Sequence, residues 1–110
     1  MDYKQSLIKK LKDYNLTISV AESCTGGQLS SFFVAQEGAS SFFSGGVIAY
    51  SPKSKVDLLK IDSKKIDDYG VVSKEIANEM SVSIKNLFNT NISISTTGNA
   101  GPYSVNSNEP

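Results

Sequence analysis

The spacing of hydrophobic residues along the chain predicts helices and strands in alternation. Apolar residues three and four positions apart predict amphipathic helices over residues 2–14, residues 27–36 and a longer segment that ends at Phe88. Alternating apolar and small polar residues predict strands over residues 16–20 and 91–95, and residues 45–50 are a third strand candidate. Strands that alternate with helices favour an α/β fold, here a three-layer α/β/α sandwich.

The helical spacing also predicts which side chains face the core. In the second helix they are Leu29, Phe32 and Phe33, and in the last helix Ile76, Met80, Ile84, Leu87 and Phe88. Ser73 is expected to cap the last helix, because a serine hydroxyl accepts a hydrogen bond from an N–H group in the first helical turn.

A short additional helix is predicted to start at Pro52. Ser51 is a suitable N-cap, and Pro52 suits the first helical position because its missing N–H would have no partner there. This helix is expected to turn three side chains inward, those of Val56, Leu58 and Leu59. Residues 62–70 are expected to form a link to the last helix.

Three strands are few for a sheet that helices cover on both faces. The 110 residues suffice for a single domain, and its sheet is expected to be incomplete at the C-terminus. No apolar run approaches the roughly 20 residues of a membrane-spanning helix, and the first residues lack the apolar centre of a signal peptide. A membrane partner is therefore not expected.

The charged residues narrow the chemistry further. Eleven basic residues balance eleven acidic ones, so the chain lacks the charge excess of a general nucleic-acid binder. All eleven basic residues are lysine, and the absence of histidine excludes a Ser-His-Asp triad, a Cys-His pair and a histidine-ligated zinc site. A base that works near neutral pH must then be a lysine, tyrosine, cysteine or carboxylate with a shifted pKa. The single cysteine excludes an internal disulfide and suits a reducing cytoplasm.

Two loops rich in glycine and hydroxyl residues follow predicted strands, ESCTGG at residues 22–27 and TTGNAGP at residues 96–102. Ligands of open α/β sheets bind at the carboxyl ends of strands, and glycine N–H groups at the start of a helix can approach an anion closely. The spacing matches neither a P-loop nor a dinucleotide-binding fingerprint, so two tight turns without a ligand are the alternative interpretation.

Four further residues have both a functional and a structural interpretation. Cys24 is a candidate nucleophile, but the lack of histidine favours a small buried residue beside a turn. Glu22 and Asp57 are candidate metal ligands, but no further carboxylate is spaced to join either, which favours a solvated or helix-capping role. Lys55 is expected on a solvated helix face, unless it is the desolvated base of a serine hydrolase that lacks histidine.

Four segments together resemble the CinA C-terminal domain family, that of the PncC-type nicotinamide mononucleotide deamidases. They are AESCTGG at 21–27, GASSFFSGGVIAYSPKSK at 38–55, YGVVS at 69–73 with the helix that follows, and TTGNAGP at 96–102. Their order and gaps agree with that family over nearly the whole chain from Thr17 onward, and the joint match is far more specific than any single segment.

The resemblance implies hydrolysis of the carboxamide of nicotinamide mononucleotide to nicotinate mononucleotide and ammonia, without a metal or an organic cofactor. The residues at matching catalytic positions are Ser23, Ser40, Tyr50, Lys55 and Thr97. Those expected to contact the substrate are Thr25, Gly26, Gly27, Gly98 and Gly101. Whether Ser23, Ser40 or water attacks the amide stays open. The expected partners are the mononucleotide and further copies of the chain in a homo-oligomer.

The chain departs from the family pattern near its end. Asn99 stands where an apolar residue is usual, and YSVNSNEP replaces the usual glycine-rich, charged stretch. The family's chain continues through a further strand and helix with a substrate-binding arginine, so residues 1–110 are expected to form a domain without its last strands and helix. The alternative function is a catalytically inactive nucleotide-binding remnant or an oligomeric partner.

Overall fold

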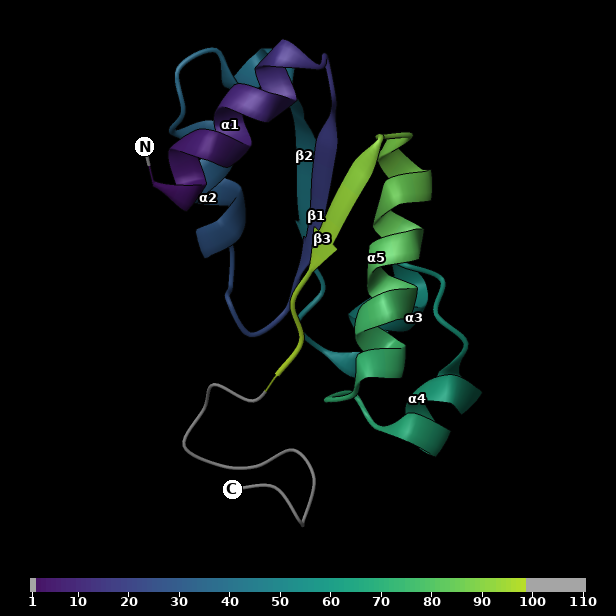
Figure 1. Ribbon diagram of the computed structural model, residues 1–110. Helices are drawn as coiled ribbons and strands as arrows, with labels where there is room; N and C mark the ends of the chain where they lie inside the picture. Colours follow the sequence, from purple (N-terminus) through teal and green to yellow (C-terminus); the bar gives the residue numbers. More distant parts are fainter. Residues whose placement is uncertain (1, 99–110) are drawn as a thin grey trace.

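A computed structural model of the protein describes residues 2–98, and Figure 1 shows how their helices and strands are arranged. In chain order these elements are α1 (Tyr3–Asp13), β1 (Ile18–Glu22), α2 (Gln28–Val34), the short 3-10 helix η1 (Ala39–Ser41), β2 (Phe43–Ile48), α3 (Pro52–Asp57), α4 (Ser63–Tyr69), α5 (Lys74–Phe88) and β3 (Ile92–Ser95). The α/β fold predicted from the sequence is confirmed.

The three strands form one parallel sheet in the order β2-β1-β3. Ile18 at the start of β1 lies opposite Phe43 on one side and opposite Ile92 on the other. All residues of β1 are buried, as expected for a central strand with helices on both faces. β1 starts and ends two residues later than alternation predicts, and its end was missed because Ala21 and Glu22 are both buried and so do not alternate.

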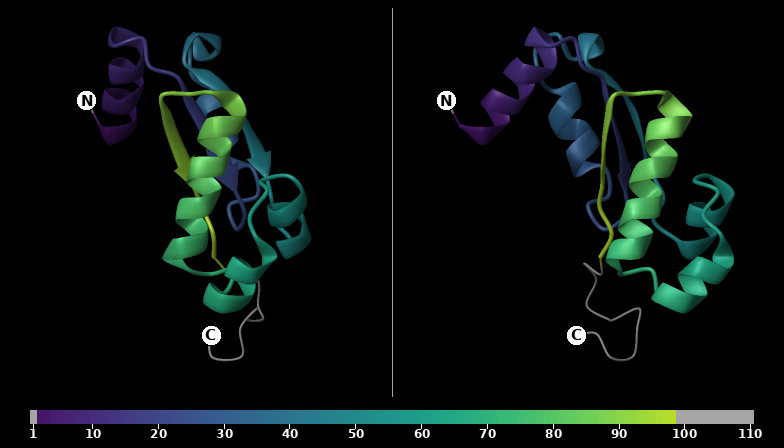
Figure 2. Two further views of the ribbon diagram at one scale, coloured as in Figure 1. Left: turned by 90° about the vertical axis from the view of Figure 1, so that its right-hand side faces the viewer. Right: turned by 45° about the vertical axis from the view of Figure 1, so that its right-hand side comes forward.

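Helices cover both faces of the sheet and give the molecule three layers (Figures 1 and 2). On one face α1 and α2 enclose a core of Ile8, Leu11, Ile18, Val20, Phe33 and Phe42. On the other face α5, with α3 and α4 beside it, encloses a core of Ala21, Ala49, Leu59, Ile61, Ile76, Met80 and Ile84. β1 therefore contributes side chains to both cores, and Ser23 follows directly after this buried strand.

Some expectations about the helices are not met. Residues 62–70, expected to form a link, contain α4, which starts where the Asp62 side chain accepts a hydrogen bond from the Lys64 N–H and ends at Gly70. Its periodicity is weak because Ile66 is its one side chain packed on the core. Leu58 and Leu87 are 53% and 60% exposed, because the next residue along, Leu59 or Phe88, takes the inward place.

The serine caps predicted for two helices are confirmed. Ser51 Oγ accepts a hydrogen bond from the Ser54 N–H at the start of α3, and Ser73 Oγ accepts one from the Ile76 N–H at the start of α5.

In α2, Phe33 is fully buried, whereas Leu29 and Phe32 pack on the same core with part of their surface exposed. Within residues 2–98, no helix is long and apolar enough to cross a membrane.

Candidate active site

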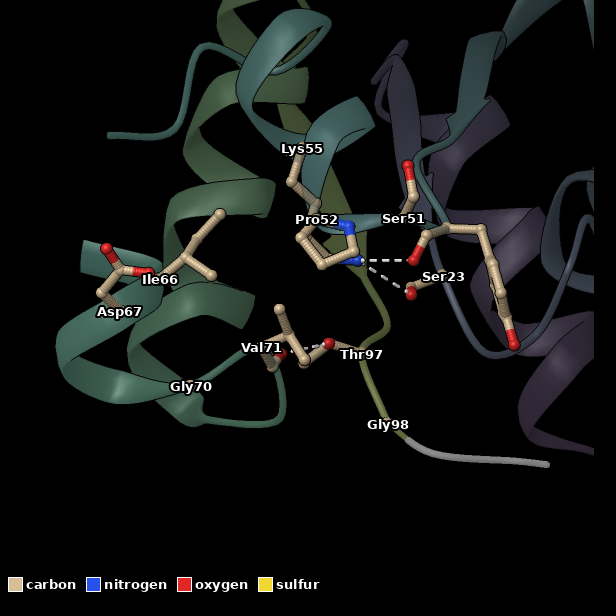
Figure 3. Close-up of a pocket in the computed structure, with 11 residues that line it drawn as sticks. Ser23, Ser51, Pro52, Lys55, Ile66, Asp67, Gly70, Val71, Thr97 and Gly98 are labelled. Carbon is tan, nitrogen blue, oxygen red and sulfur yellow. Dashed lines mark hydrogen bonds between the residues drawn. The ribbon is translucent and has the colours of Figure 1, made fainter. Parts of the chain in front are cut away.

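The carboxyl ends of the three parallel strands lie around a single cavity of about 490 Å³. Such a volume is ordinary for a small-molecule site, and this end of a parallel sheet is where ligands usually bind. Loops after all three strands and side chains from α3 and α4 contribute to its wall (Figure 3). The lining residues are Ser23, Tyr50, Ser51, Pro52, Lys55, Ile66, Asp67, Gly70, Val71, Thr97 and Gly98.

Lys55 reaches the bottom of this cavity from the last turn of α3 and is only 1% exposed. Its Nζ donates hydrogen bonds to the Ala49 carbonyl at 2.8 Å, to Ser23 Oγ at 3.1 Å and to the Tyr50 carbonyl at 3.1 Å. All three partners are uncharged oxygens. Burial therefore lowers the pKa of Lys55 below its usual value, with a smaller opposite effect from the nearby Cys24.

The arrangement around Nζ determines where a neutral Lys55 would direct its lone pair. A neutral amine has two N–H bonds and one lone pair, and backbone carbonyls can only accept hydrogen bonds. The carbonyls of Ala49 and Tyr50 therefore take both N–H bonds. The lone pair is left to face the hydroxyl of Ser23, which can then donate its proton to Nζ. The geometry suits proton transfer from a serine to a lysine.

Tyr50 and Thr97 also line the cavity, in agreement with their position at strand ends. The carbonyl of Tyr50 holds Lys55, while its side chain is 67% exposed. Thr97 Oγ1 donates a hydrogen bond to the Val71 carbonyl at 2.6 Å, which joins the segment after β3 to the segment after α4. The sequence pattern did not indicate Asp67, because residues 62–70 were expected to be a link, and Val71 lies in the YGVVS segment of the resemblance without having been assigned a role.

Ser40 lies away from the cavity, at the opposite end of the sheet. It belongs to η1, just before β2, whereas Ser23 comes just after β1. The two strands are parallel, with Ile18 opposite Phe43 and Glu22 opposite Ile48, so about five strand residues, or about 16 Å, separate the two serines. Within one chain, Ser40 therefore does not reach the cavity that contains Ser23 and Lys55.

Glu22 is the last residue of β1 and is completely buried. Its carboxylate accepts hydrogen bonds from the Leu29 N–H at 2.9 Å, the Gly27 N–H at 3.2 Å, the Ser30 N–H at 2.8 Å and the Ser30 hydroxyl at 2.5 Å, all at the start of α2. Burial works to raise the pKa of Glu22, but hydrogen bonds from Ser30, Thr25 and Leu29 outweigh it and lower the pKa to about 2. Of its open interpretations, helix capping is confirmed.

This cap changes the expectation for the first glycine loop. The Gly27 N–H donates to Glu22, and the Gly26 N–H donates to the Ser23 carbonyl at 3.2 Å, so both already have acceptors within the chain. The positive end of α2 faces a protein carboxylate, which would repel a phosphate.

In the second glycine loop, Gly98 lines the cavity, and Gly101 lies outside the described residues. Within residues 2–98, no three side chains of metal-ligating type lie together.

The model of the CinA C-terminal domain family matches the whole chain, residues 1–110. The chain belongs to this family. A CinA-like protein from Flavobacterium psychrophilum is 43% identical over 100 residues, which cover 91% of this chain and 24% of that protein. A CinA-like protein from Fervidobacterium nodosum is 44% identical over 96 residues, which cover 87% of this chain and 24% of that protein.

Solved CinA-family structures share the fold. Competence damage-inducible protein A from Klebsiella pneumoniae superposes with a TM-score of 0.93 at 29% identity, over 97% of this chain and 66% of that one. A CinA superfamily protein from Escherichia coli gives a TM-score of 0.87 at 30% identity, over 90% of this chain and 58% of that one. The chain thus spans about a quarter of the curated relatives' length and roughly three fifths of the solved chains.

Proposed function

We propose that this CinA-family chain is an amide hydrolase that converts nicotinamide mononucleotide into nicotinate mononucleotide and ammonia. The observation that supports it most is the contact of 3.1 Å between the buried Lys55 Nζ and Ser23 Oγ, at the bottom of a cavity of small-molecule size. A nucleophile paired with a desolvated base is the machinery that amide hydrolysis needs. The choice of this particular amide rests on the resemblance to the deamidases.

The proposed reaction starts with neutral Lys55. As Ser23 Oγ bonds to the carboxamide carbon, its proton passes to Lys55 Nζ, and the electron pair of the C=O bond moves onto the amide oxygen. When this intermediate collapses, the C–N bond breaks and the Lys55 ammonium returns the proton to the departing nitrogen. Ammonia leaves, and the acyl group stays on Ser23 as an ester.

Water completes the cycle in the same geometry. Lys55 takes a proton from a water molecule as its oxygen bonds to the ester carbon, and the C–O bond to Ser23 then breaks. Ser23 regains its proton from Lys55, and the product leaves as a carboxylic acid that loses its remaining proton to solvent and becomes the carboxylate. The two halves together consume one water per amide. Ser23 is favoured over Ser40 as the nucleophile because Ser40 lies about 16 Å away at the other end of the sheet.

The test compares two lysines of the same short helix. Lys55→Met keeps the length of the side chain but removes the base, so we expect kcat for ammonia release from nicotinamide mononucleotide to fall at least about 100-fold. Lys53→Met is the matched control, because Lys53 is exposed and pairs with Asp57 on the surface. Circular dichroism checks that both variants fold.

Two results would count against the proposal. One is ammonia release by Lys55→Met at the rate of the unsubstituted chain, which would remove the lysine from the mechanism. The other is no release of ammonia from the mononucleotide by the folded, unsubstituted chain.

The proposal also assigns the enzyme to the cytoplasm, which suits a chain whose single cysteine cannot form an internal disulfide.

A further inference from the structure

A line of side-chain hydrogen bonds joins Glu22 to the backbone of Ser23 through two threonines. Thr25 Oγ1 lies 2.6 Å from Glu22 Oε1 and 2.9 Å from Thr96 Oγ1. Thr96 Oγ1 lies 3.2 Å from the backbone nitrogen of Ser23. The Thr96 N–H also donates to the Ala21 carbonyl at 2.9 Å, so the line crosses from the end of β1 to the end of β3.

The number of available protons fixes the direction of each bond in this line. The ionised carboxylate of Glu22 can only accept, so Thr25 donates its single hydroxyl proton to it. Thr25 must then accept from Thr96, which gives up its own hydroxyl proton. The remaining lone pairs of Thr96 Oγ1 accept the N–H of Ser23. Every member thus has one role, and a charged acceptor at the end strengthens the line.

We propose that Thr25 and Thr96 are positioning residues for Ser23, with the capped carboxylate of Glu22 as the fixed end of the line. This inference rests on the proposed function, since it names the groups that hold the nucleophile at the base. The line holds the Ser23 backbone, from which Oγ reaches Lys55 Nζ at 3.1 Å. A shift of about 1 Å at a reacting atom can reduce a rate about 100-fold.

The inference also gives Thr25 a different role from the one expected from the sequence. Its hydroxyl proton goes to Glu22 and its oxygen accepts from Thr96, so its side chain acts between two protein groups. Thr25 is absent from the residues that line the cavity, as is Thr96, although their neighbours Ser23 and Thr97 line it. Both threonines are therefore assigned to holding Ser23, with which their line of hydrogen bonds ends.

The experiment uses matched substitutions of the two threonines in the 110-residue chain. Thr25→Val and Thr96→Val keep the shape of the side chain and remove the hydroxyl, whereas Thr25→Ser and Thr96→Ser keep the hydroxyl. The first readout is the rate at which a fluorophosphonate probe labels Ser23, located by peptide mass spectrometry. The second readout is kcat and KM for ammonia release from nicotinamide mononucleotide.

We expect each valine variant to label Ser23 and to release ammonia about 10- to 100-fold more slowly, with KM changed less than about threefold. Each serine variant should stay within about threefold of the unsubstituted chain. The double valine variant should lose little more than either single one, because one break already interrupts the line. Ser19→Ala is the control for an effect on stability alone. Ser19 is buried on β1, the strand that precedes Ser23, and its hydroxyl hydrogen-bonds to Thr90 Oγ1 at 2.7 Å, outside the line of threonines.

The outcomes separate this inference from the proposed function. Valine variants that are less stable but label Ser23 at the original rate would overturn the inference. Labelling of the unsubstituted chain without ammonia release would reject the deamidase alone, and the labelling rates would still decide the role of the threonines. If Ser23 of the folded chain does not react with the probe at all, no reactive serine is positioned and the inference fails.

A measurement on the unsubstituted chain decides the case in which no valine variant folds. The Ser23 N–H is expected to exchange slowly with solvent in NMR experiments, because Thr96 accepts it in a line anchored on Glu22. Exchange as fast as that of an exposed loop amide would overturn the inference.

Discussion

A lysine side chain in water is protonated at neutral pH, and the ten other lysines of this chain are exposed. Lys55 is 1% exposed and bonds to uncharged oxygens alone, so its hydrogen-bond partners offer no negative charge to offset the loss of water around the ammonium. The lowered pKa of Lys55 is the direct consequence. One residue thus acquires its chemistry from burial rather than from a charged partner.

The pH dependence of the reaction tests whether Lys55 is the base. The base is neutral Lys55, so kcat/KM should rise with pH until the lowered pKa of Lys55, and level off below the ordinary value of 10.5. Lys53→Met should keep this profile. A rate that is flat across the same range, or one that falls as pH rises, would contradict the assignment of Lys55 as base.

The unit formed by β1, the loop after it and α2 depends on a single carboxylate. Glu22 takes up the N–H groups at the start of α2 together with the Ser30 hydroxyl, so the strand, the loop and the helix are fixed to one another. Without Glu22, these N–H groups in the first turn of α2 would have no hydrogen-bond partner within the helix. The same carboxylate ends the line of threonines, so the stability of this unit and the position of Ser23 share one anchor.

Acid is expected to destabilise the contact between β1 and α2 that Glu22 makes. The pKa of Glu22 falls from 4.5 to about 2 on folding, so its contribution is complete above pH 4.5 and is lost as pH decreases through about 2. A change of this size corresponds to about 3–3.5 kcal/mol of unfolding free energy at most. Urea unfolding between pH 2 and pH 6 should show this loss, and Glu22→Gln should remove it.

Glu79→Gln provides the control for that experiment. Glu79 forms an exposed ion pair with Lys65 at 2.5 Å, and such surface pairs contribute at most about 1 kcal/mol. Its substitution should leave most of the acid dependence in place. The same acid dependence in Glu22→Gln as in the unsubstituted chain would show that the cap is not the acid-sensitive element.

The packing of α2 on β2 depends on the absence of a side chain at Gly46. A Cβ atom there would lie 2.6 Å from Ser30 Oγ and 2.6 Å from Val20 Cγ2, closer than real contacts allow. Ser30 is also a donor to Glu22, so pressure on it reaches the cap. The close approach of helix to strand is what makes glycine necessary at this position.

Gly46→Ala is therefore expected to destabilise the fold by about 1–3 kcal/mol, the usual cost of forcing an extra methyl group against closely packed neighbours. Ser44→Ala on the same strand is the control, because Ser44 is exposed and this substitution removes an oxygen without adding an atom. Thermal unfolding measures both variants, and Gly46→Ala should melt at least about 4 °C lower than the control. Equal melting temperatures would mean that α2 moves away from β2 without cost.

Charge over the whole molecule bears on how a nucleotide would bind. The chain has no arginine, and Lys55 and Asp67 are the charged residues among those that line the cavity in the described part. The three hydrogen-bonding positions of Lys55 Nζ are already taken by Ser23 and two carbonyls, and the start of α2 faces Glu22. A phosphate would therefore gain little from the described residues.

We accordingly expect this chain to discriminate weakly between nicotinamide mononucleotide and the riboside that lacks its phosphate. The ratio of their kcat/KM values for ammonia release should stay within about tenfold, since one phosphate contact of ordinary strength contributes about 1.4 kcal/mol or more. Asp67→Asn should raise kcat/KM for the mononucleotide more than for the riboside, because it removes a negative charge from the cavity wall. A preference above about 100-fold for the mononucleotide would contradict this reasoning.

The sequence by itself determined the features that depend on neighbours along the chain. The apolar stripe of Ile76, Met80 and Ile84 predicted α5, the caps Ser51 and Ser73 predicted two helix starts, and the strand patterns predicted three strands in an α/β fold. The place of the cavity follows from these, because parallel strands bring their carboxyl ends together. Such signals are local, since periodicity and capping involve residues three or four positions apart.

Only the tertiary structure decided what the candidate site residues can do. Lys55 and Ser23 are 32 residues apart and Thr25 and Thr96 are 71 apart, so neither contact has a signature in the sequence. The same holds for the burial of Lys55, which a helical pattern places on a solvated face, and for the separation of Ser40 from the cavity. Burial and hydrogen-bond partners set a pKa and orient a lone pair, and both depend on which distant segments the fold brings into contact.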